Sequence, residues 1–295
     1  MTSAAQQTPL DRIASDFAES RLAMFGLALL GLMLMIAIIA PLISPQNPYD
    51  LAQLDVVDGR LPPGSASANG ATFWLGSDDQ GRDMLSAIFY GLRISLTVGI
   101  ASTALALALG LALGLAAAYF GGWVETLIMR IADIQLSFPA ILIALILLAV
   151  LGQGTLKIIV ALVTVQWAYY ARTVRSAALV EKRKEYIEAA RCLALPPSRI
   201  VFRHMLPNCL PPLIVVATVQ VAAAIALEAT LSFLGLGLPI TEPSLGLLIA
   251  NGYQYLLSGK YWISFFPGVA LLLTIVSINL VADQLRDVVN PRLQR

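Results

Sequence analysis

Long stretches without a charged residue restrict what this chain can fold into more than any other feature. A helix that crosses a membrane needs about 20 predominantly apolar residues, because the bilayer core offers no water to the backbone polar groups. Six apolar stretches approach or exceed that length: Leu22–Ile43, Ile94–Phe120, Ile134–Val150, Ile158–Ala171, Leu206–Leu227 and Tyr261–Ala282. Only 13% of the residues are charged, whereas roughly a quarter are charged in soluble domains. We therefore predict an all-α integral membrane protein with six transmembrane helices.

The third and fourth stretches reach span length only with help from their flanks. Ile134–Val150 is long enough if Arg130 and Asp133 lie at the membrane interface. Ile158–Ala171 has only 14 residues, but tryptophan and tyrosine near its end form an aromatic belt. The cations that flank it can extend toward the interface. We therefore count both stretches as transmembrane helices.

Lysine and arginine indicate the orientation, because they are enriched in the short cytoplasmic loops of membrane proteins. With six crossings, both termini lie on one side of the membrane. That side holds 14 of the 19 basic residues, and the other side holds five. Both termini, and the loop between the fourth and fifth helices, are therefore predicted to be cytoplasmic.

The chain is predicted to form a single unit without internal repeats. Its parts, in order, are a cytoplasmic N-terminal tail (1–21), the first transmembrane helix (22–43), an extracytoplasmic segment (44–92), a five-helix core (93–285) with a cytoplasmic loop (172–205), and a cytoplasmic C-terminal tail (286–295). In the N-terminal tail, Leu10, Ile13 and Phe17 share one face of a helix. This pattern is typical of a short helix on the membrane surface, and a disordered tail is the alternative.

Polar residues concentrate in the cytoplasmic loop, where KRKEYIEAARCLALPPSRIVFRHMLPN (182–208) contains six basic residues and the only histidine. Tyr186, Ala189 or Ala190, and Leu193 recur at helical spacing. This spacing predicts a helix over Glu181–Leu195, which the two following prolines end. A short amphipathic helix outside the membrane suits docking of another protein. The alternative is a basic loop that lies on anionic lipid headgroups.

The sequence gives no support for an active site within this chain. It contains no G-x-x-x-x-G-K-[ST] phosphate loop, so the chain does not hydrolyse ATP alone. Its one histidine, His204, has no recognisable catalytic partner, and Cys192 and Cys209 show neither a disulfide framework nor metal-ligand spacing. We therefore predict no enzymatic activity, no cofactor and no metal site. A formal net charge of +1 gives no indication of a nucleic-acid partner.

Four ordered motifs, spread over about 220 residues, resemble one family. EYIEAARCLALPPSRIVFRHMLPN resembles the EAA loop of ABC-importer permeases, and FWLGSDDQGRDMLSAIFYGLRISL (Phe73–Leu96) is similar to a segment of their dipeptide/oligopeptide/nickel branch. ATLSFLGLGLP with PSLGLLIANG, and FFPGVALLLTIVSINLVADQLRDVVNPR, are similar to later segments of that branch. The single long extracytoplasmic segment after the first helix resembles the subunit that pairs with a differently built second permease.

The resemblance implies the fold and the partners of a type I ABC importer in the bacterial inner membrane. Such a complex has two membrane subunits, two cytoplasmic ATPase subunits that bind ATP and Mg²⁺, and an extracytoplasmic solute-binding protein. Peptides are the cargo that the resemblance favours. Nickel chelates, glutathione-like peptides and opines remain alternatives, because the binding protein usually sets selectivity in this architecture.

The resemblance also assigns roles in the cytoplasmic loop, which forms a coupling helix against the ATPase in the family. It implies that Glu188, Ala189 and Ala190 lie at the ATPase contact, with Leu193 packed beside them. Ala194 stands where the family has glycine. Because alanine resists the left-handed backbone that glycine permits, we do not expect a sharp bend at Ala194.

Two further groups of residues each have a functional and a structural interpretation. Asp78, Gly81, Arg82 and Asp83 belong to the segment that resembles the family signature, which suggests contact with the binding protein. A tight turn with internal charge pairing explains them as well. Gly110 and Gly114 form a G-x-x-x-G pattern, which is typical of a close contact between membrane helices but also occurs by chance.

Two polar residues in the predicted membrane region are candidates for the translocation pathway. Glu228, late in the fifth helix, is a charge that is costly within a membrane. It either lines the pathway, lies at the outer end of the helix, or pairs with another subunit. Asn279 in the sixth helix either faces the substrate or forms a hydrogen bond to a neighbouring helix.

Two other classes of protein are alternatives to an importer subunit. A stand-alone secondary transporter should contain inverted repeats or a cluster of ionisable residues at the membrane midplane, and the sequence has neither. A membrane scaffold that recruits a cytoplasmic protein without transport would use the same loop. The sequence therefore leaves the scaffold as the alternative from another class.

Overall fold

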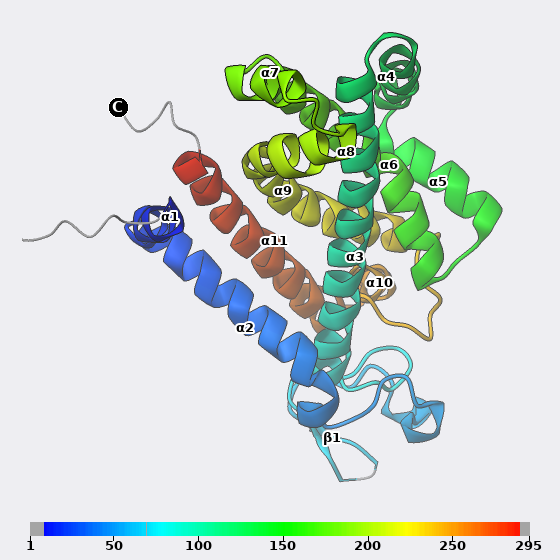
Figure 1. Ribbon diagram of the computed structural model, residues 1–295. Helices are drawn as coiled ribbons and strands as arrows, with labels where there is room; N and C mark the ends of the chain where they lie inside the picture. Colours follow the sequence, from blue (N-terminus) through cyan, green and yellow to red (C-terminus); the bar gives the residue numbers. More distant parts are fainter. Residues whose placement is uncertain (1–8, 69, 290–295) are drawn as a thin grey trace, which may run out of the picture.

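The computed structural model describes residues 9–68 and 70–289, and most of these residues are helical (Figure 1). The α-helices in chain order are α1 Pro9–Ala18, α2 Arg21–Ile43, α3 Met84–Phe120, α4 Gly122–Ser137, α5 Ala140–Leu151, α6 Thr155–Glu181, α7 Glu185–Cys192, α8 Pro197–Arg199, α9 Leu206–Phe233, α10 Leu245–Tyr253 and α11 Trp262–Val289. The other elements are the 3-10 helices η1 Leu51–Gln53, η2 Val56–Asp58 and η4 Leu256–Ser258, the π-helix η3 Ile200–Met205, and the strands β1 Ser65–Ala66 and β2 Thr72–Phe73. The strands pair antiparallel, with Ser65 opposite Phe73.

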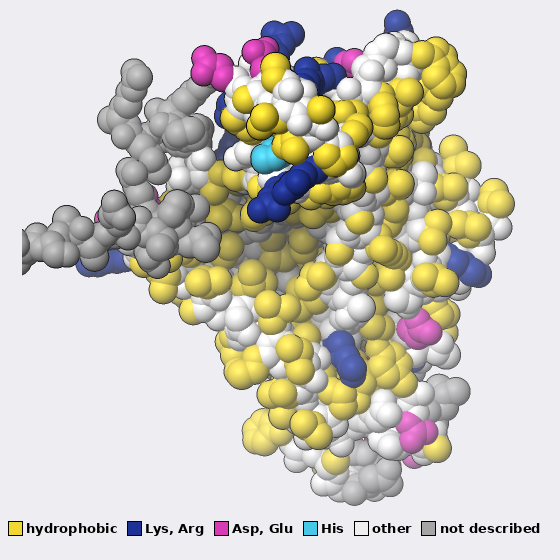
Figure 2. Space-filling view, in the orientation of Figure 1, with side chains coloured by type: hydrophobic (Ala, Val, Ile, Leu, Met, Phe, Trp, Pro, Cys, Tyr) yellow, Lys and Arg dark blue, Asp and Glu magenta, His cyan; other side chains and the backbone are white. Residues whose placement is uncertain are grey.

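The long helices form one layered bundle around α3. This central helix packs against α2, α6 and α9, while α11 packs against α2, α9 and α10. α1 and the C-terminal end of α11 lie at the same end of the molecule as α7, and the segment between α2 and α3 forms the opposite end (Figure 1). Figure 2 shows apolar side chains over the middle of the molecule and charged side chains gathered over the α7 end. This distribution suits a molecule surrounded by lipid at its middle.

Four helical stretches of the described chain are long and apolar enough to cross a membrane: Arg21–Ile43, Met84–Phe120, Pro197–Phe233 and Trp262–Val289. They agree with the first, second, fifth and sixth predicted stretches. α3 begins at Met84, inside the predicted extracytoplasmic segment 44–92, and α11 continues to Val289, inside the predicted tail 286–295. The remainder of that tail, 290–295, lies outside the described residues, as do residues 1–8 of the predicted N-terminal tail.

The third predicted span, Ile134–Val150, is not one continuous helix. Residues 134–150 are divided between α4 and α5, which meet at an angle of 93° and count as a fifth crossing only if the bent pair is one span. Phe138, before Pro139, has an extended backbone with φ −96° and ψ 145°. A residue before proline is pushed out of the helical region, and the proline supplies no N–H to continue the helix.

The fourth predicted stretch belongs to α6, a helix of 27 residues that extends beyond it at both ends. α6 is not among the four stretches that are both long and apolar enough to cross a membrane, so six crossings are not confirmed. Its two arginines face α4: an Arg172 nitrogen lies 2.5 Å from Asp133 Oδ1, and Arg175 Nε donates to Glu125 Oε1 at 2.7 Å. Residues 172–181 of the predicted cytoplasmic loop form the C-terminal end of α6, and the non-helical part of that loop begins at Lys182.

The G-x-x-x-G pattern marks the closest approach of α3 and α6. A Cβ added at Gly110 would lie 2.4 Å from Tyr170 Cβ, and one added at Gly114 would lie 2.6 Å from Val174 Cβ. Real side chains do not approach so closely. The two glycines therefore allow α6 to pack directly on the backbone of α3, as small residues do in membrane bundles.

Candidate functional site

The loop after α6 folds into a short helix fixed to the bundle on one side only. α7 spans Glu185–Cys192, starting later and ending earlier than the predicted helix over Glu181–Leu195. Glu185 and Glu188 lie in its first turn and Arg191 in its last. Acids near the N-terminus and bases near the C-terminus complement the helix dipole, which helps so short a helix to form.

The inner face of α7 is held by apolar contacts. Ile187 and Ala190 are 0% and 4% exposed. They belong to a buried cluster that also contains Ile200, Met205 and Cys209, from η3 and the start of α9. Because Ile187 and Ala190 are three residues apart, they lie on the same side of the helix. α7 is therefore packed against the start of α9 rather than free to swing.

The outer face of α7 is exposed and has no partner within the described chain. Glu188 and Ala189 are exposed, and Leu193, just after the helix, is 74% exposed. The structure thus divides the EAA triplet: Glu188 and Ala189 point outward, whereas Ala190 packs inward. An exposed leucine beside a small alanine and a carboxylate is a surface that suits a protein partner.

A hydrogen-bond network at the base of α7 was not anticipated from the sequence. The Tyr186 hydroxyl donates to a Glu181 carboxylate oxygen and accepts from Asn208 Nδ2 at 3.0 Å, and Lys184 Nζ lies 2.6 Å from Glu181 Oε1. Burial, followed by the neighbouring carboxylate, raises the pKa of Tyr186 to about 12. The hydroxyl therefore stays protonated at neutral pH. Tyr186 links the end of α6 to the start of α9, which local sequence pattern does not reveal.

The expectation of no sharp bend at Ala194 is wrong. Ala194 has φ 54°, in the left-handed region. Its N–H donates to Arg191 O at 2.9 Å, and the N–H of Leu195 donates to Ala190 O at 3.1 Å. This pair of bonds is the Schellman arrangement that ends many helices, usually with glycine in the left-handed position. The bonds hold alanine in a conformation that it otherwise avoids.

Ala194→Gly is therefore expected to stabilise the protein. A left-handed L-residue costs about 1–2 kcal/mol, and the larger unfolded-state entropy of glycine cancels part of that gain, so we expect up to about 1 kcal/mol. In a thermal melt of the detergent-purified protein, this corresponds to an increase in Tm of about 2–4 °C. Ala189→Gly, inside α7, is the matched control and should lower Tm, because glycine is unfavourable in a helix interior. A decrease in Tm for Ala194→Gly would contradict the strain at this position.

Asp78, Gly81, Arg82 and Asp83 form a buried turn at the opposite end of the molecule. Asp78 Oδ1 accepts from the backbone N–H groups of Gln80 and Arg82, each at 2.9 Å. Gly81 has φ 77°, and an added Cβ would lie 2.0 Å from Asp55 O. Asp83 caps α3, its Oδ2 accepting from Ser86 N at 2.8 Å. The interpretation as a tight turn describes this geometry.

Direct contact of these residues with a binding protein is not supported. The side chains of Asp78 and Arg82 are 0% exposed, and Asp83 is also buried. Arg82 Nη2 donates to Ile240 O at 2.7 Å, and Arg82 Nη1 lies 3.7 Å from Asp78 Oδ2. Arg82 therefore fastens the segment before α3 to the loop between α9 and α10, inside the protein.

The burial of Asp78 predicts a dependence of stability on pH. Burial raises the pKa of its carboxyl from 3.8 to about 6, against the opposing effect of the Arg82 charge. Since the folded value lies above the unfolded value, the stabilisation is complete below pH 4 and is lost as the pH rises through about 6. This difference between the folded and unfolded pKa of Asp78 corresponds to about 3 kcal/mol of stability. Between pH 4 and pH 7, the Tm of the wild-type protein should therefore fall by more than the Tm of Asp78→Asn. Equal changes in Tm for the two proteins would contradict a raised pKa of Asp78.

The two pathway candidates lie in different environments. Glu228 is fully buried inside the chain, where it accepts hydrogen bonds from Ser95 Oγ at 3.0 Å and Ser232 Oγ at 2.7 Å. It ties α9 to α3 and does not face an open pathway. Asn279 is exposed on α11, near the exposed apolar residues Leu272 and Val276. The structure does not bring the two residues into one site.

Comparisons with known proteins point to one family. Residues 106–295 match the family described as binding-protein-dependent transport system inner membrane component, and residues 8–63 match the N-terminal TM domain of oligopeptide transport permease C. A di/tripeptide transport system permease protein of Pseudomonas aeruginosa is 35% identical over 287 residues, covering 97% of this chain and 93% of the relative. An oligopeptide transport system permease protein of Bacillus subtilis is 35% identical over 279 residues, covering 95% and 88%.

A solved structure supports the fold independently. A chain of the MetNI methionine ABC transporter, in an inward-facing conformation, aligns with a TM-score of 0.56. The alignment covers 70% of this chain and 97% of the MetNI chain at 24% sequence identity. At this level of identity the similarity concerns the fold alone.

Proposed function

Because this chain belongs to the family of inner-membrane components of binding-protein-dependent transport systems, we propose that it is the permease subunit of an ATP-driven importer of short peptides. The relatives that match over nearly their whole length are named as di/tripeptide, dipeptide and oligopeptide permeases. The observation that carries the coupling role is the exposed face of α7, formed by Glu188, Ala189 and Leu193 on a helix whose other face is anchored. That face is the contact for an ATPase subunit.

The proposed topology has six crossings, with both termini and α7 in the cytoplasm. The bent pair α4–α5 and the helix α6 provide the two crossings beyond the four apolar stretches. At 1.5 Å per residue, the 27 residues of α6 measure about 40 Å, enough to span a bilayer. Its arginines are paired with acids of α4, which lowers the free-energy cost of placing these charges in or near the membrane. Gln284 Nε2 donates to Asp16 O at 3.2 Å, which supports termini on the same side.

The coupling mechanism follows from how α7 is attached. When the ATPase subunits close, they move the outer face of α7. The apolar contacts of Ile187 and Ala190 with η3 and the start of α9 transmit that movement to α9. The bonds of Tyr186 to Glu181 and Asn208 link the same movement to the end of α6. ATP and Mg²⁺ are bound by the ATPase partners, and this chain contributes no phosphate loop.

The complete importer then contains four kinds of subunit: this chain, a second permease, ATPases, and an extracytoplasmic solute-binding protein. A pull-down of the chain from its native membrane in mild detergent, followed by mass spectrometry, tests this composition. Recovery of a second permease and of P-loop ATPases is the expected result. Recovery of the chain alone, under conditions that keep other membrane complexes intact, would contradict the importer and favour a scaffold.

A further inference from the structure

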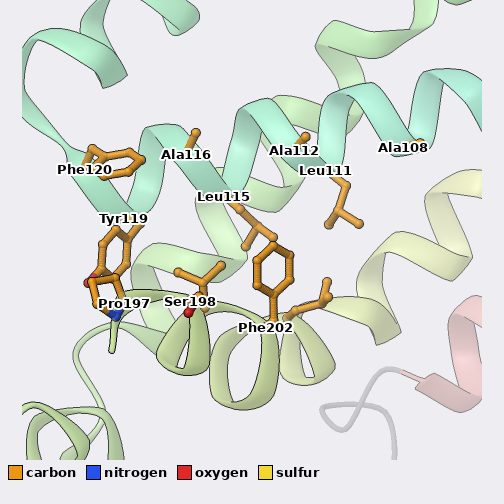
Figure 3. Close-up of a pocket in the computed structure, with 12 residues that line it drawn as sticks. Ala108, Leu111, Ala112, Leu115, Ala116, Tyr119, Phe120, Pro197, Ser198 and Phe202 are labelled. Carbon is orange, nitrogen blue, oxygen red and sulfur yellow. The ribbon is translucent and has the colours of Figure 1, made fainter. Parts of the chain in front are cut away.

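An apolar groove of about 500 Å³ lies beside the chain that follows α7, outside the face assigned to the ATPase. One wall is the C-terminal half of α3, and the other is the chain from Pro197 to Leu206, as seen in Figure 3. Leu115 and Phe202 point toward the space between the walls, and Phe202 is 65% exposed. The volume falls within the range of about 300–1,000 Å³ that is usual for ligand sites.

The length of the groove matches one leaflet of a membrane. It follows α3 from Ala108 to Phe120, a rise of about 18 Å at 1.5 Å per residue. Half of the hydrocarbon core measures about 15 Å. Tyr119 and Phe120 lie at the end of the groove beside Pro197 (Figure 3), where aromatic side chains are expected at the membrane interface. An acyl chain of the adjacent leaflet has the right length and polarity to fill this space.

Basic residues lie on or beside both elements that form the groove. Arg199 and Arg203 are exposed and directly follow the lining residues Ser198 and Phe202 in the sequence, and neither forms an ion pair within the described ranges. Lys182 Nζ donates to the carbonyl oxygens of Ala118 and Tyr119, each at 2.8 Å. An ammonium group has three donors, so one of them is left for a further oxygen.

We propose that this groove binds an anionic phospholipid of the cytoplasmic leaflet. One acyl chain occupies the space between α3 and Phe202, and the phosphate lies against Arg199 and Arg203, with Lys182 adding charge. Basic pockets beside membrane helices on the cytoplasmic side are known to recognise anionic headgroups. A purely apolar helix of a partner would fill the same space but would leave both arginines without a counter-charge. The side of the membrane rests on the topology under the proposed function, whereas the groove and its charges do not.

Photocrosslinking within the assembled importer tests the proposal. Phe202 is replaced by p-benzoylphenylalanine, and the complex is placed in vesicles of equal phosphatidylglycerol and phosphatidylcholine. After irradiation, mass spectrometry identifies what is attached. Since each arginine near the surface favours an anionic lipid several-fold, we expect phosphatidylglycerol adducts to exceed phosphatidylcholine adducts about tenfold. Arg199→Gln with Arg203→Gln should remove most of that preference, and Arg286→Gln, at an exposed arginine near the end of α11, should preserve it.

Two results would overturn the proposal. Equal adducts with both lipids would show an apolar groove without headgroup recognition. Adducts mainly with the second permease would show a protein interface instead. If the ATPases do not assemble with the chain, the proposed function fails, but the same irradiation of the chain alone in these vesicles still decides what the groove binds.

Discussion

Ala189→Arg is expected to uncouple the importer while leaving this subunit folded. Ala189 is exposed on the outer face of α7, where a small side chain allows close approach of a partner. A long charged side chain there would hold the ATPase away without disturbing the inner contacts of α7. We expect peptide uptake, and ATPase activity stimulated by binding protein and peptide, to fall at least tenfold in proteoliposomes, a loss of about 1.4 kcal/mol or more.

Two companion variants separate docking from folding. Ala189→Ser keeps the side chain small and should retain uptake. Ala190→Arg lies on the buried face, at 4% exposure, and should lower Tm because it forces a charge into an apolar cluster. Ala189→Arg should instead keep the Tm of the wild type. Unchanged uptake and unchanged yield of the complex for Ala189→Arg would refute the assignment of the outer face.

Gly110→Val is expected to have the largest effect on stability. The added Cβ would lie 2.4 Å from Tyr170 Cβ and 2.6 Å from Trp167 O, so α3 and α6 would have to move apart. Overpacking typically costs about 1–3 kcal/mol and more where backbone must shift, and we expect a cost near or above the top of that range. The measurements are the yield of folded protein in detergent and its Tm.

Gly31→Val is the matched control for this prediction. Gly31 also lies in an apolar helix, α2, but an added Cβ there meets nothing within 4 Å. The same change of residue type should therefore be tolerated at position 31. A similar Tm for the two valine variants would mean that the approach of α3 and α6 contributes little to stability.

The sequence predicts the long apolar helices well, because a membrane span is a local property of about 20 residues. The break between α4 and α5 was also visible in principle, since Pro139 lies inside the predicted span. The spans were identified by their lack of charged residues, and this criterion does not detect a proline because proline is uncharged. The sequence did not predict the full length of α6, for a different reason. The apolar stretch ends at Arg172, and the partner of this arginine, Asp133, lies 39 positions earlier, so local sequence does not show that the helix continues.

The candidate site was predicted in part. Periodicity placed Tyr186, one of the two alanines Ala189 and Ala190, and Leu193 on one face of a helix. Which of the two alanines faces outward depends on the contact of α7 with η3 and α9. The bend at Ala194 depends on two hydrogen bonds that override a local preference. The burial of Arg82 depends on the carbonyl of Ile240, 158 positions later. Contacts between such distant positions are not contained in any local pattern.

The labelling rate of Cys192 tests the coupling surface most directly. Cys192 is exposed at the end of α7, whereas Cys209 is buried, so the chain carries its own probe and its own internal control. A maleimide is added to the purified permease pair with and without the ATPase subunits, and mass spectrometry follows both thiols. We predict that the ATPases slow the labelling of Cys192 several-fold, while Cys209 stays unreactive in both samples. Equal labelling of Cys192 with and without bound ATPases would contradict docking at α7.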